Sequence, residues 1–334
     1  MGENNGDTRL GRCLGFLNTA RQELARRIVG QEEMIDGLLM ALIAGGHILL
    51  EGVPGLAKTL AIKSMADITG LAFKRIQFTP DLLPADLTGT LVWEQSSGTF
   101  SVRRGPVFAN VILADEINRA PAKVQSALLE AMEERQVTIG EKSYSLPDPF
   151  FVLATQNPIE HEGTYALPEA ELDRFLLKLL IRYPSHEEEI RVLHFSAPIS
   201  RERQALKPLK VVLSAEVLEE FRAAADAVRI DERITKYIVS VVAATRPVSG
   251  DAAIKEGVYR YISFGASPRA SIALHRCSRI AALFAGRSFV SPEDVKAVTL
   301  PVLRHRIVLS YEAEADGLDP DGVISRILAF VPVP

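Results

Sequence analysis

The sequence predicts an α/β fold with a five-stranded parallel sheet flanked by helices, followed by a smaller all-helical region. In the first half of the chain, short apolar runs alternate with amphipathic stretches of helical periodicity, which is typical of a parallel sheet. The five predicted strands are residues 47–51, 72–78, 110–115, 150–155 and 175–181. Open α/β sheets bind ligands at the carboxyl ends of their strands, so we expect functional side chains directly after these runs.

In the second half the pattern becomes helical. Three stretches have apolar residues spaced by three and four: residues 212–228, 232–246 and 267–286. Ser267 before Pro268 predicts an N-cap and a first helical residue, and Gly286 predicts the end of that helix. We therefore expect two domains, an α/β core over residues 1–183 and a helical domain over residues 184–334.

Composition narrows the class of protein. The 334 residues are 47% apolar, which is enough for two domains. The 38 basic and 42 acidic side chains give a net charge of −4, which provides no bulk attraction for nucleic acid. The two cysteines exclude a disulfide framework. The longest apolar run, residues 37–50, is too short to span a bilayer, and the N-terminus lacks the features of a signal peptide. We expect a cytoplasmic protein without a membrane span.

Two stretches of the first half are predicted hairpins. Residues 88–110 contain a Ser-Ser-Gly turn, and residues 136–148 turn near Gly140. They are either contact arms that project from the core or loops that only cover the sheet. Trp93 and Phe100 in the first hairpin are either partner contacts or a packed cross-strand pair.

A phosphate-binding loop is predicted at residues 52–59, GVPGLAKT, between the first strand and a helical stretch. Its glycines let successive backbone N–H groups point at one phosphate. Lys58 supplies a mobile charge for the β- and γ-phosphates, and Thr59 supplies a hydroxyl for magnesium. Ala57 stands where a glycine is usual, keeps the N–H, and favours helix over glycine by about 1 kcal/mol. The loop therefore predicts an ATP site.

Two acids end the third predicted strand. Asp115 at the strand tip is suited to hold magnesium, and Glu116 beyond it is suited to polarise a water for in-line attack on the γ-phosphate. Asn157 follows the fourth strand and orients the same water if that strand lies between the other two. The alternatives are a solvated strand end for the acids and a plain turn residue for Asn157.

Two arginines complete the predicted site. Arg174 follows a short predicted helix and precedes a strand. Arg269 lies in the first turn of a helix, where the helix dipole disfavours a cation unless an anion is bound nearby. Either arginine is alternatively a structural partner of a carboxylate, and Asp173 is adjacent to Arg174. The six histidines have no metal-ligand spacing.

These motifs, in this order, resemble the MoxR family of AAA+ ATPases. The strings that match the family are QFTPDLLPADLTG, GPVFAN, LADEINRAP, LLEAMEERQVTIG, ATQNPIEHEGTYALPEAELDRF and GASPRAS. The resemblance runs from about residue 28 to the C-terminus and implies an AAA+ core followed by a helical lid. Ala57 is itself a family trait.

The resemblance also implies a role for each motif. The Walker A loop comprises Gly52, Val53, Pro54, Gly55, Leu56, Ala57, Lys58 and Thr59. Asp115 and Glu116 would be Walker B, Asn157 sensor 1, and Val29 and Gly30 would lie near the adenine. Arg174 would be an arginine finger for the neighbouring subunit's ATP, and Arg269 would be sensor 2. ATP or ADP and Mg²⁺, with Thr59 and Asp115 as metal ligands, are the implied cofactors.

The family's implied function is chaperone-like maturation or activation of protein complexes. The implied partners are further copies of the chain in a ring, with a hexamer expected, and a von Willebrand factor A domain protein. The hairpins would project toward a central pore; the client is unknown. The alternatives are a nucleic-acid motor, a magnesium-chelatase-type ATPase subunit, a small-molecule kinase and a nucleotide-gated scaffold. Nucleic acid is disfavoured because the hairpins contain few cations, namely Arg103, Arg104 and Lys142.

Overall fold

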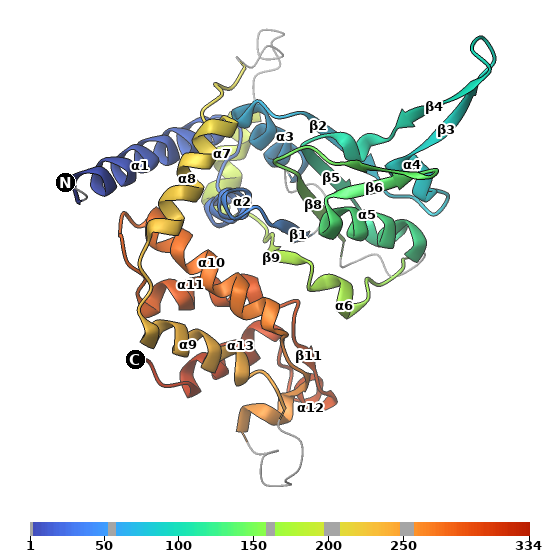
Figure 1. The fold of residues 1–334 in the computed structure, drawn as a ribbon. Coiled ribbons are helices and arrows are strands. Elements are labelled where there is room, and N and C mark those ends of the chain that lie inside the picture. The colour runs from blue at the N-terminus through green and yellow to red at the C-terminus, as the bar shows by residue number, and fades with distance from the viewer. Residues whose placement is uncertain (1–2, 53–57, 158–163, 197–207, 248–256) are drawn as a thin grey trace. The chain divides into compact units, whose positions relative to one another are not determined.

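The computed structural model describes residues 3–52, 58–157, 164–196, 208–247 and 257–334 (Figure 1). The chain forms two compact units. One contains residues 15–167 and 179–218, and the other contains residues 1–14, 168–178 and 219–334. The domain boundary predicted at residue 183 stays a prediction.

The five predicted strands all form, each within one residue of its expected ends, in a sheet of order β2-β5-β8-β1-β9 (Figure 1). They are β1 (His47–Glu51), β2 (Phe73–Gln77), β5 (Val111–Asp115), β8 (Phe151–Gln156) and β9 (Phe175–Leu180). In β1, β5 and β8 every residue but the last is buried. Strands covered on both faces are continuous apolar runs, which is why the sequence predicted them well.

Helices precede, connect and follow these strands. They are α1 (Glu3–Ala25), α2 (Glu32–Ala44), α3 (Lys58–Thr69), α4 (Pro84–Thr88), α5 (Ala122–Glu134) and α7 (His186–Ser196). The apolar run at residues 37–50 is divided between α2, which has nine buried residues, and β1; Gly45 ends α2 in the left-handed conformation at φ 65°. No helix of the described residues is long and apolar enough to cross a membrane.

Both predicted hairpins form, as β3 (Gly89–Glu94) with β4 (Thr99–Arg104) and β6 (Gln136–Ile139) with β7 (Lys142–Ser145). Trp93 and Phe100 are directly opposite each other, with ring centroids 5.0 Å apart, although both rings are more than half exposed. The hairpins contact each other, since a Cβ at Gly140 would lie 2.7 Å from Leu91 Cδ1. The guanidinium of Arg104 lies over aromatic rings of Phe108 and Tyr144.

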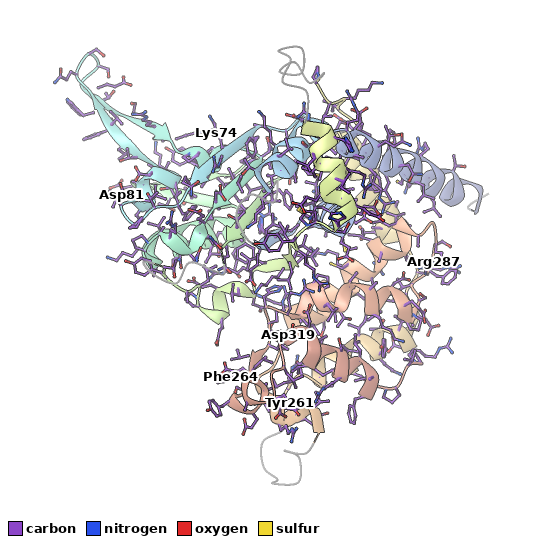
Figure 2. All side chains as sticks on the ribbon, turned by 180° about the vertical axis from the view of Figure 1, so that it is seen from behind. Lys74, Asp81, Tyr261, Phe264, Arg287 and Asp319 are labelled. Atoms are coloured by element: carbon purple, nitrogen blue, oxygen red, sulfur yellow. The ribbon has the colours of Figure 1, made fainter. Side chains whose placement is uncertain are left out.

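The second unit is mainly helical, as expected. Its helices are α6 (Glu169–Leu172), α9 (Glu232–Ala243), α10 (Pro268–Phe284), α11 (Pro292–Leu303), α12 (Tyr311–Ala315) and α13 (Pro320–Phe330), and α8 (Ala215–Ala227) begins in the first unit. Ser267 caps α10, and Gly286, at φ 71°, follows its end, as the sequence predicts. The unit also contains an unpredicted antiparallel ribbon, β10 (Ile262–Phe264) with β11 (Val308–Leu309). Tyr261 before β10 is buried, whereas Phe264 is exposed (Figure 2).

His47, the first residue of β1, is a buried neutral side chain that joins three elements. Its Nδ1 accepts a hydrogen bond from Val152 N at 3.1 Å, and its Nε2 lies 3.3 Å from Met132 O. Burial and, secondarily, the charge of Arg135 lower the pKa of His47 to about 3. The ring therefore stays uncharged across the ordinary pH range.

This pKa predicts how stability depends on pH. In the unfolded chain a histidine titrates near pH 6.5, so below that pH the unfolded state binds a proton that folded His47 does not bind. Stability is therefore lost as the pH falls below about 6.5. Between pH 6.5 and 5.5 the free energy of unfolding of the wild type should fall by about 1 kcal/mol more than that of His47→Asn, measured by urea unfolding. Equal pH dependence of the two proteins would contradict a neutral buried His47.

Candidate active site

The described residues at the two ends of the predicted phosphate loop are close together. Val53, Pro54, Gly55, Leu56 and Ala57 lie outside the described residues. Gly52 directly follows β1, and Lys58 is the first residue of α3. The Lys58 Nζ donates a hydrogen bond to Gly52 O. A Cβ at Gly52 would lie 2.7 Å from Ile181 O, so only glycine fits there. Lys58 is therefore held at the carboxyl end of β1, and Thr59 is the next residue of α3.

The electrostatics around Lys58 describe a polar site. Burial lowers the pKa of Lys58, and the negative charges of its surroundings oppose that shift. The carboxylates that oppose it are Asp115, Glu116 and Glu51. The ammonium group of Lys58 and these carboxylates thus belong to one cluster of opposite charges at the carboxyl ends of β1 and β5.

Asp115 at the end of β5 is held from both neighbouring strands. Thr155 of β8 donates its hydroxyl to Asp115 Oδ1 at 2.6 Å. Arg75 of β2 donates through Nη2 and Nε to Asp115 Oδ2, at 2.6 and 3.0 Å. The carboxylate is therefore fixed in orientation, and its side chain is 15% exposed.

Glu116 leaves the strand in a different direction because its backbone is left-handed, at φ 56°. Its N–H donates to the Thr155 hydroxyl at 2.8 Å. Its carboxylate oxygen Oε2 accepts from Gln77 at 2.8 Å and pairs with Arg119 at 3.1 Å. The two adjacent acids therefore have separate partners, and one buried hydroxyl connects them.

Asn157 directly follows β8 and is buried. In the sheet, β8 lies between β5 and β1, which confirms the order on which its predicted role depends. Thr155 is in register with Leu50 of β1, so Asn157 follows the strand that separates the acids from the phosphate loop.

Val29 and Gly30 lie at a cavity of about 880 Å³, which is within the usual range for a small-molecule site. Ile28 and Ile35 give it apolar surface, and its other lining residues include Arg21, Gln22, Asp36, Arg191 and His194. Gly30 has φ 69°, a left-handed backbone conformation that favours glycine at this position.

Sequence reasoning missed three contributors to this site: Arg75, Gln77 and Thr155. Gln77 and Thr155 lie at the carboxyl ends of predicted strands, which was an available signal. Arg75 is two residues before Gln77 and so shares its face of β2, and Arg75 Nη2 donates to Gln77 Oε1 at 2.9 Å.

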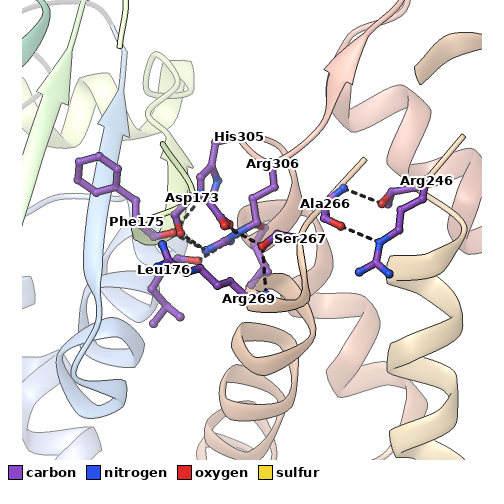
Figure 3. Close-up of polar contacts among 11 residues, drawn as sticks. Asp173, Phe175, Leu176, Arg246, Ala266, Ser267, Arg269, His305 and Arg306 are labelled. Carbon is purple, nitrogen blue, oxygen red and sulfur yellow. Dashed lines mark hydrogen bonds and ion pairs between the residues drawn. The ribbon is translucent and has the colours of Figure 1, made fainter. Parts of the chain in front are cut away.

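Arg174 and Arg269 belong to the second unit. Arg174 lies between α6 and β9, and Arg269 lies in the first turn of α10. Asp173, adjacent to Arg174, forms an ion pair with Arg306 at 2.7 Å and accepts from the Ser267 hydroxyl at 2.7 Å (Figure 3). The segments that contain the two predicted arginines are therefore joined through Asp173 and Ser267.

A parallel sheet with a lysine at the start of the helix after β1, and two acids at the end of a nearby strand, defines a P-loop nucleoside triphosphatase. The family described as "ATPase family associated with various cellular activities (AAA)" matches residues 47–177, and the AAA lid domain matches residues 255–327.

Similar proteins identify the family of AAA ATPases to which the chain belongs. The chain is 47% identical to Chaperone MoxR1 of Mycobacterium tuberculosis over 95% of this chain and 82% of that protein. It is 33% identical to Protein MoxR of Methylorubrum extorquens over 94% of each. The crystal structure of a candidate ATPase from Cytophaga hutchinsonii has a TM-score of 0.88 at 46% identity, over 99% of this chain and 98% of that one. The chain belongs to the MoxR family of AAA+ ATPases.

Proposed function

We propose that this protein hydrolyses ATP to ADP and phosphate in a magnesium-dependent reaction and uses the cycle to remodel or activate partner protein complexes. The observation that supports hydrolysis is the separate fixation of two adjacent carboxylates, Asp115 and Glu116, beside the ammonium group of Lys58. A site that only bound nucleotide would not require a second, independently oriented acid.

Binding is assigned to the loop and the cavity. Lys58 contacts the β- and γ-phosphates, and the loop residues from Gly52 to Thr59 supply backbone N–H groups. Val29 and Gly30 contact the adenine, because their cavity combines apolar surface with polar edges. Lys58 is partly desolvated already, which strengthens its attraction for phosphate.

The available donors fit magnesium. The Thr59 hydroxyl and the Asp115 carboxylate are hard oxygen ligands, which Mg²⁺ prefers. Among the described residues no group of three or more His, Cys, Asp or Glu side chains is placed to hold a metal ion, as suits an ion that is shared with substrate phosphates. When bound, Mg²⁺ neutralises charge on the phosphate oxygens.

Glu116 is assigned as the base that polarises the attacking water, and Asn157 orients that water. Gln77 and Arg119 hold the Glu116 carboxylate, so its direction is set before substrate binds. Arg174 acts on the ATP of a neighbouring subunit in a ring, with six subunits expected, and Arg269 is a second contact to phosphate.

Remodelling of protein partners rests on two observations. A relative with 47% identity is named a chaperone, and the first hairpin presents an exposed aromatic pair, Trp93 and Phe100, suited to contact a protein. A von Willebrand factor A domain protein is the proposed partner, and the cytoplasm is the proposed location.

A nucleic-acid motor is disfavoured because Arg104, one of the three cations of the hairpins, packs over two aromatic rings.

Lys58→Ala tests binding. The variant loses the cation for the phosphates but no apolar core, so its melting temperature without nucleotide should match the wild type. At an ATP concentration of about 100 times the wild-type Kd, ligand linkage stabilises the wild type by about 2.7 kcal/mol, and the variant should lose this gain. An unchanged ATP-induced rise in melting temperature would show that Lys58 does not contact the phosphates.

Glu116→Gln and Asp115→Asn test the division of roles. Glu116→Gln keeps size and hydrogen bonding but removes the base, so hydrolysis should fall about a hundredfold or more while ATP still binds. Asp115→Asn should instead weaken magnesium-dependent binding, measured by titrating ATP with and without Mg²⁺. Identical behaviour of the two variants would refute the separate roles.

Arg174→Ala tests the finger. A guanidinium supplied in trans contributes roughly a thousandfold or more to the rate, so the variant should bind ATP almost normally and hydrolyse it very slowly. Mixing it with Glu116→Gln is the sharper test, because some interfaces then pair an intact Glu116 with an intact Arg174. Partial activity should return. Mixed rings that stay inactive would argue against the supply of Arg174 by a neighbour.

A further inference from the structure

Arg306, which follows α11, is a buried cation that holds the segment around Arg174. Its side chain is 3% exposed. It donates to Asp173 Oδ1 at 2.7 Å, to Leu176 O at 3.1 Å and to Phe175 O at 2.5 Å (Figure 3). A buried charge is retained only when its partners are well placed, so these bonds fix the chain on both sides of Arg174.

The same carboxylate reaches the helix that contains Arg269. Asp173 Oδ2 accepts from the Ser267 hydroxyl at 2.7 Å, and that hydroxyl in turn accepts from Arg269 N at 3.1 Å (Figure 3). One carboxylate thus connects the residue before Arg174 with the N-cap of α10. The first turn of α10, including the backbone of Arg269, is set by this connection.

Ser267 is also fixed from its other side. Ala266 N donates to the buried Thr245 hydroxyl at 2.9 Å, and Ala266 O accepts from Arg246 Nε at 2.9 Å (Figure 3). A Cβ at Gly265 would lie 2.4 Å from Thr245 O, so the chain before α10 packs directly on the end of α9. The chain that leads to Ser267 is therefore held against the end of α9.

The ion pair of Arg304 and Asp321 lies near by in the sequence and supports β9, but it is not connected to Arg174 or to Ser267 through these bonds. Arg304 binds Asp321 through Nε and Nη2, both at 2.9 Å, and donates to Lys178 O at 3.0 Å. It holds β9 in a similar way to Arg306, but these bonds reach neither Arg174 nor Ser267.

We propose that Asp173, Ser267 and Arg306 form a positioning clamp that holds Arg174 and Arg269 in a fixed relative position, so that the two guanidinium groups act as one preorganised pair. The inference rests on the proposed function, which assigns both arginines to phosphate. In this assignment the clamp residues act by orienting the backbone from which the arginines extend, and the arginines alone contact nucleotide. A misplacement of about 1 Å at a catalytic group lowers a rate by about a hundredfold, which sets the scale of the expected effect.

Ser267→Ala is the test, and Ser291→Ala is its matched control. Ser291 also precedes a proline at a helix start, donates its hydroxyl to Asp294 at 3.0 Å, and that carboxylate is bound by Arg287 at 2.7 Å. Both variants should lose similar thermal stability and keep the ATP-induced rise in melting temperature. The kcat of Ser267→Ala should fall about tenfold to a hundredfold, and that of Ser291→Ala should stay within about twofold of the wild type, as for a residue with only a capping role.

Two further substitutions at Ser267 separate the effect of its hydroxyl on kcat from the contribution of the helix cap to stability. Ser267→Gly keeps most of the capping stability but has no hydroxyl, so its kcat should fall as in Ser267→Ala. Ser267→Thr keeps the hydroxyl and should restore kcat. A normal kcat in Ser267→Gly would overturn the clamp even if Ser267→Ala proved too unstable to assay.

A comparison across backgrounds excludes a general structural effect. In the variant Arg174→Ala/Arg269→Ala no arginine remains to be positioned, so adding Ser267→Ala should leave the residual single-turnover rate unchanged. A merely structural serine would lower the rate by the same factor in both backgrounds, and that result would overturn the clamp.

Failure of the clamp and failure of the proposed function give different results. If Arg174→Ala hydrolyses ATP slowly while Ser267→Ala equals Ser291→Ala, the clamp is wrong and the finger stands. If Arg174→Ala keeps full turnover, the proposed role of Arg174 is wrong, and the clamp that rests on it is overturned as well.

Discussion

The hydroxyl of Thr155 is the contact on which the acid half of the site depends. It is buried, donates to Asp115 Oδ1 and accepts from Glu116 N, so it joins the ends of β5 and β8 and directs two adjacent carboxylates apart. Adjacent residues of a strand point to opposite faces, but the left-handed backbone of Glu116 breaks that alternation. A strained conformation at a non-glycine residue persists only when its surroundings determine it, and here the hydroxyl and Gln77 do so.

Charge burial follows one rule in both units. Lys58 is partly buried beside carboxylates, and Arg306 is almost fully buried against Asp173 and backbone carbonyls. His47 forms hydrogen bonds with the backbone of Val152 and Met132 and is neutral instead, with its pKa lowered to about 3. Burial thus selects either a paired charge or an uncharged form, and the paired charges lie beside the residues proposed to act on phosphate.

The sequence predicted the strands and hairpins well because their signals are local. Central strands are continuous apolar runs, and the hairpin turns contain glycine where the backbone requires it. The ribbon of β10 and β11 was missed because its strands are only three and two residues long, too short for a pattern. The partner of Asp173 was also not predictable: the adjacent Arg174 was the obvious candidate, but the ion pair is formed with Arg306, 133 residues away.

The predicted functional residues fall into two groups with different supports. Lys58, Asp115 and Glu116 are oriented by the sheet, whose carboxyl ends meet at one edge. Arg174 and Arg269 lie in the other unit and are oriented by helix caps and by buried Arg306. Each group is thus held by hydrogen bonds and ion pairs within its own unit. In the proposed ring, hydrolysis would then be controlled by how a subunit presents its arginine pair to its neighbour, which is a property of assembly rather than of the acids.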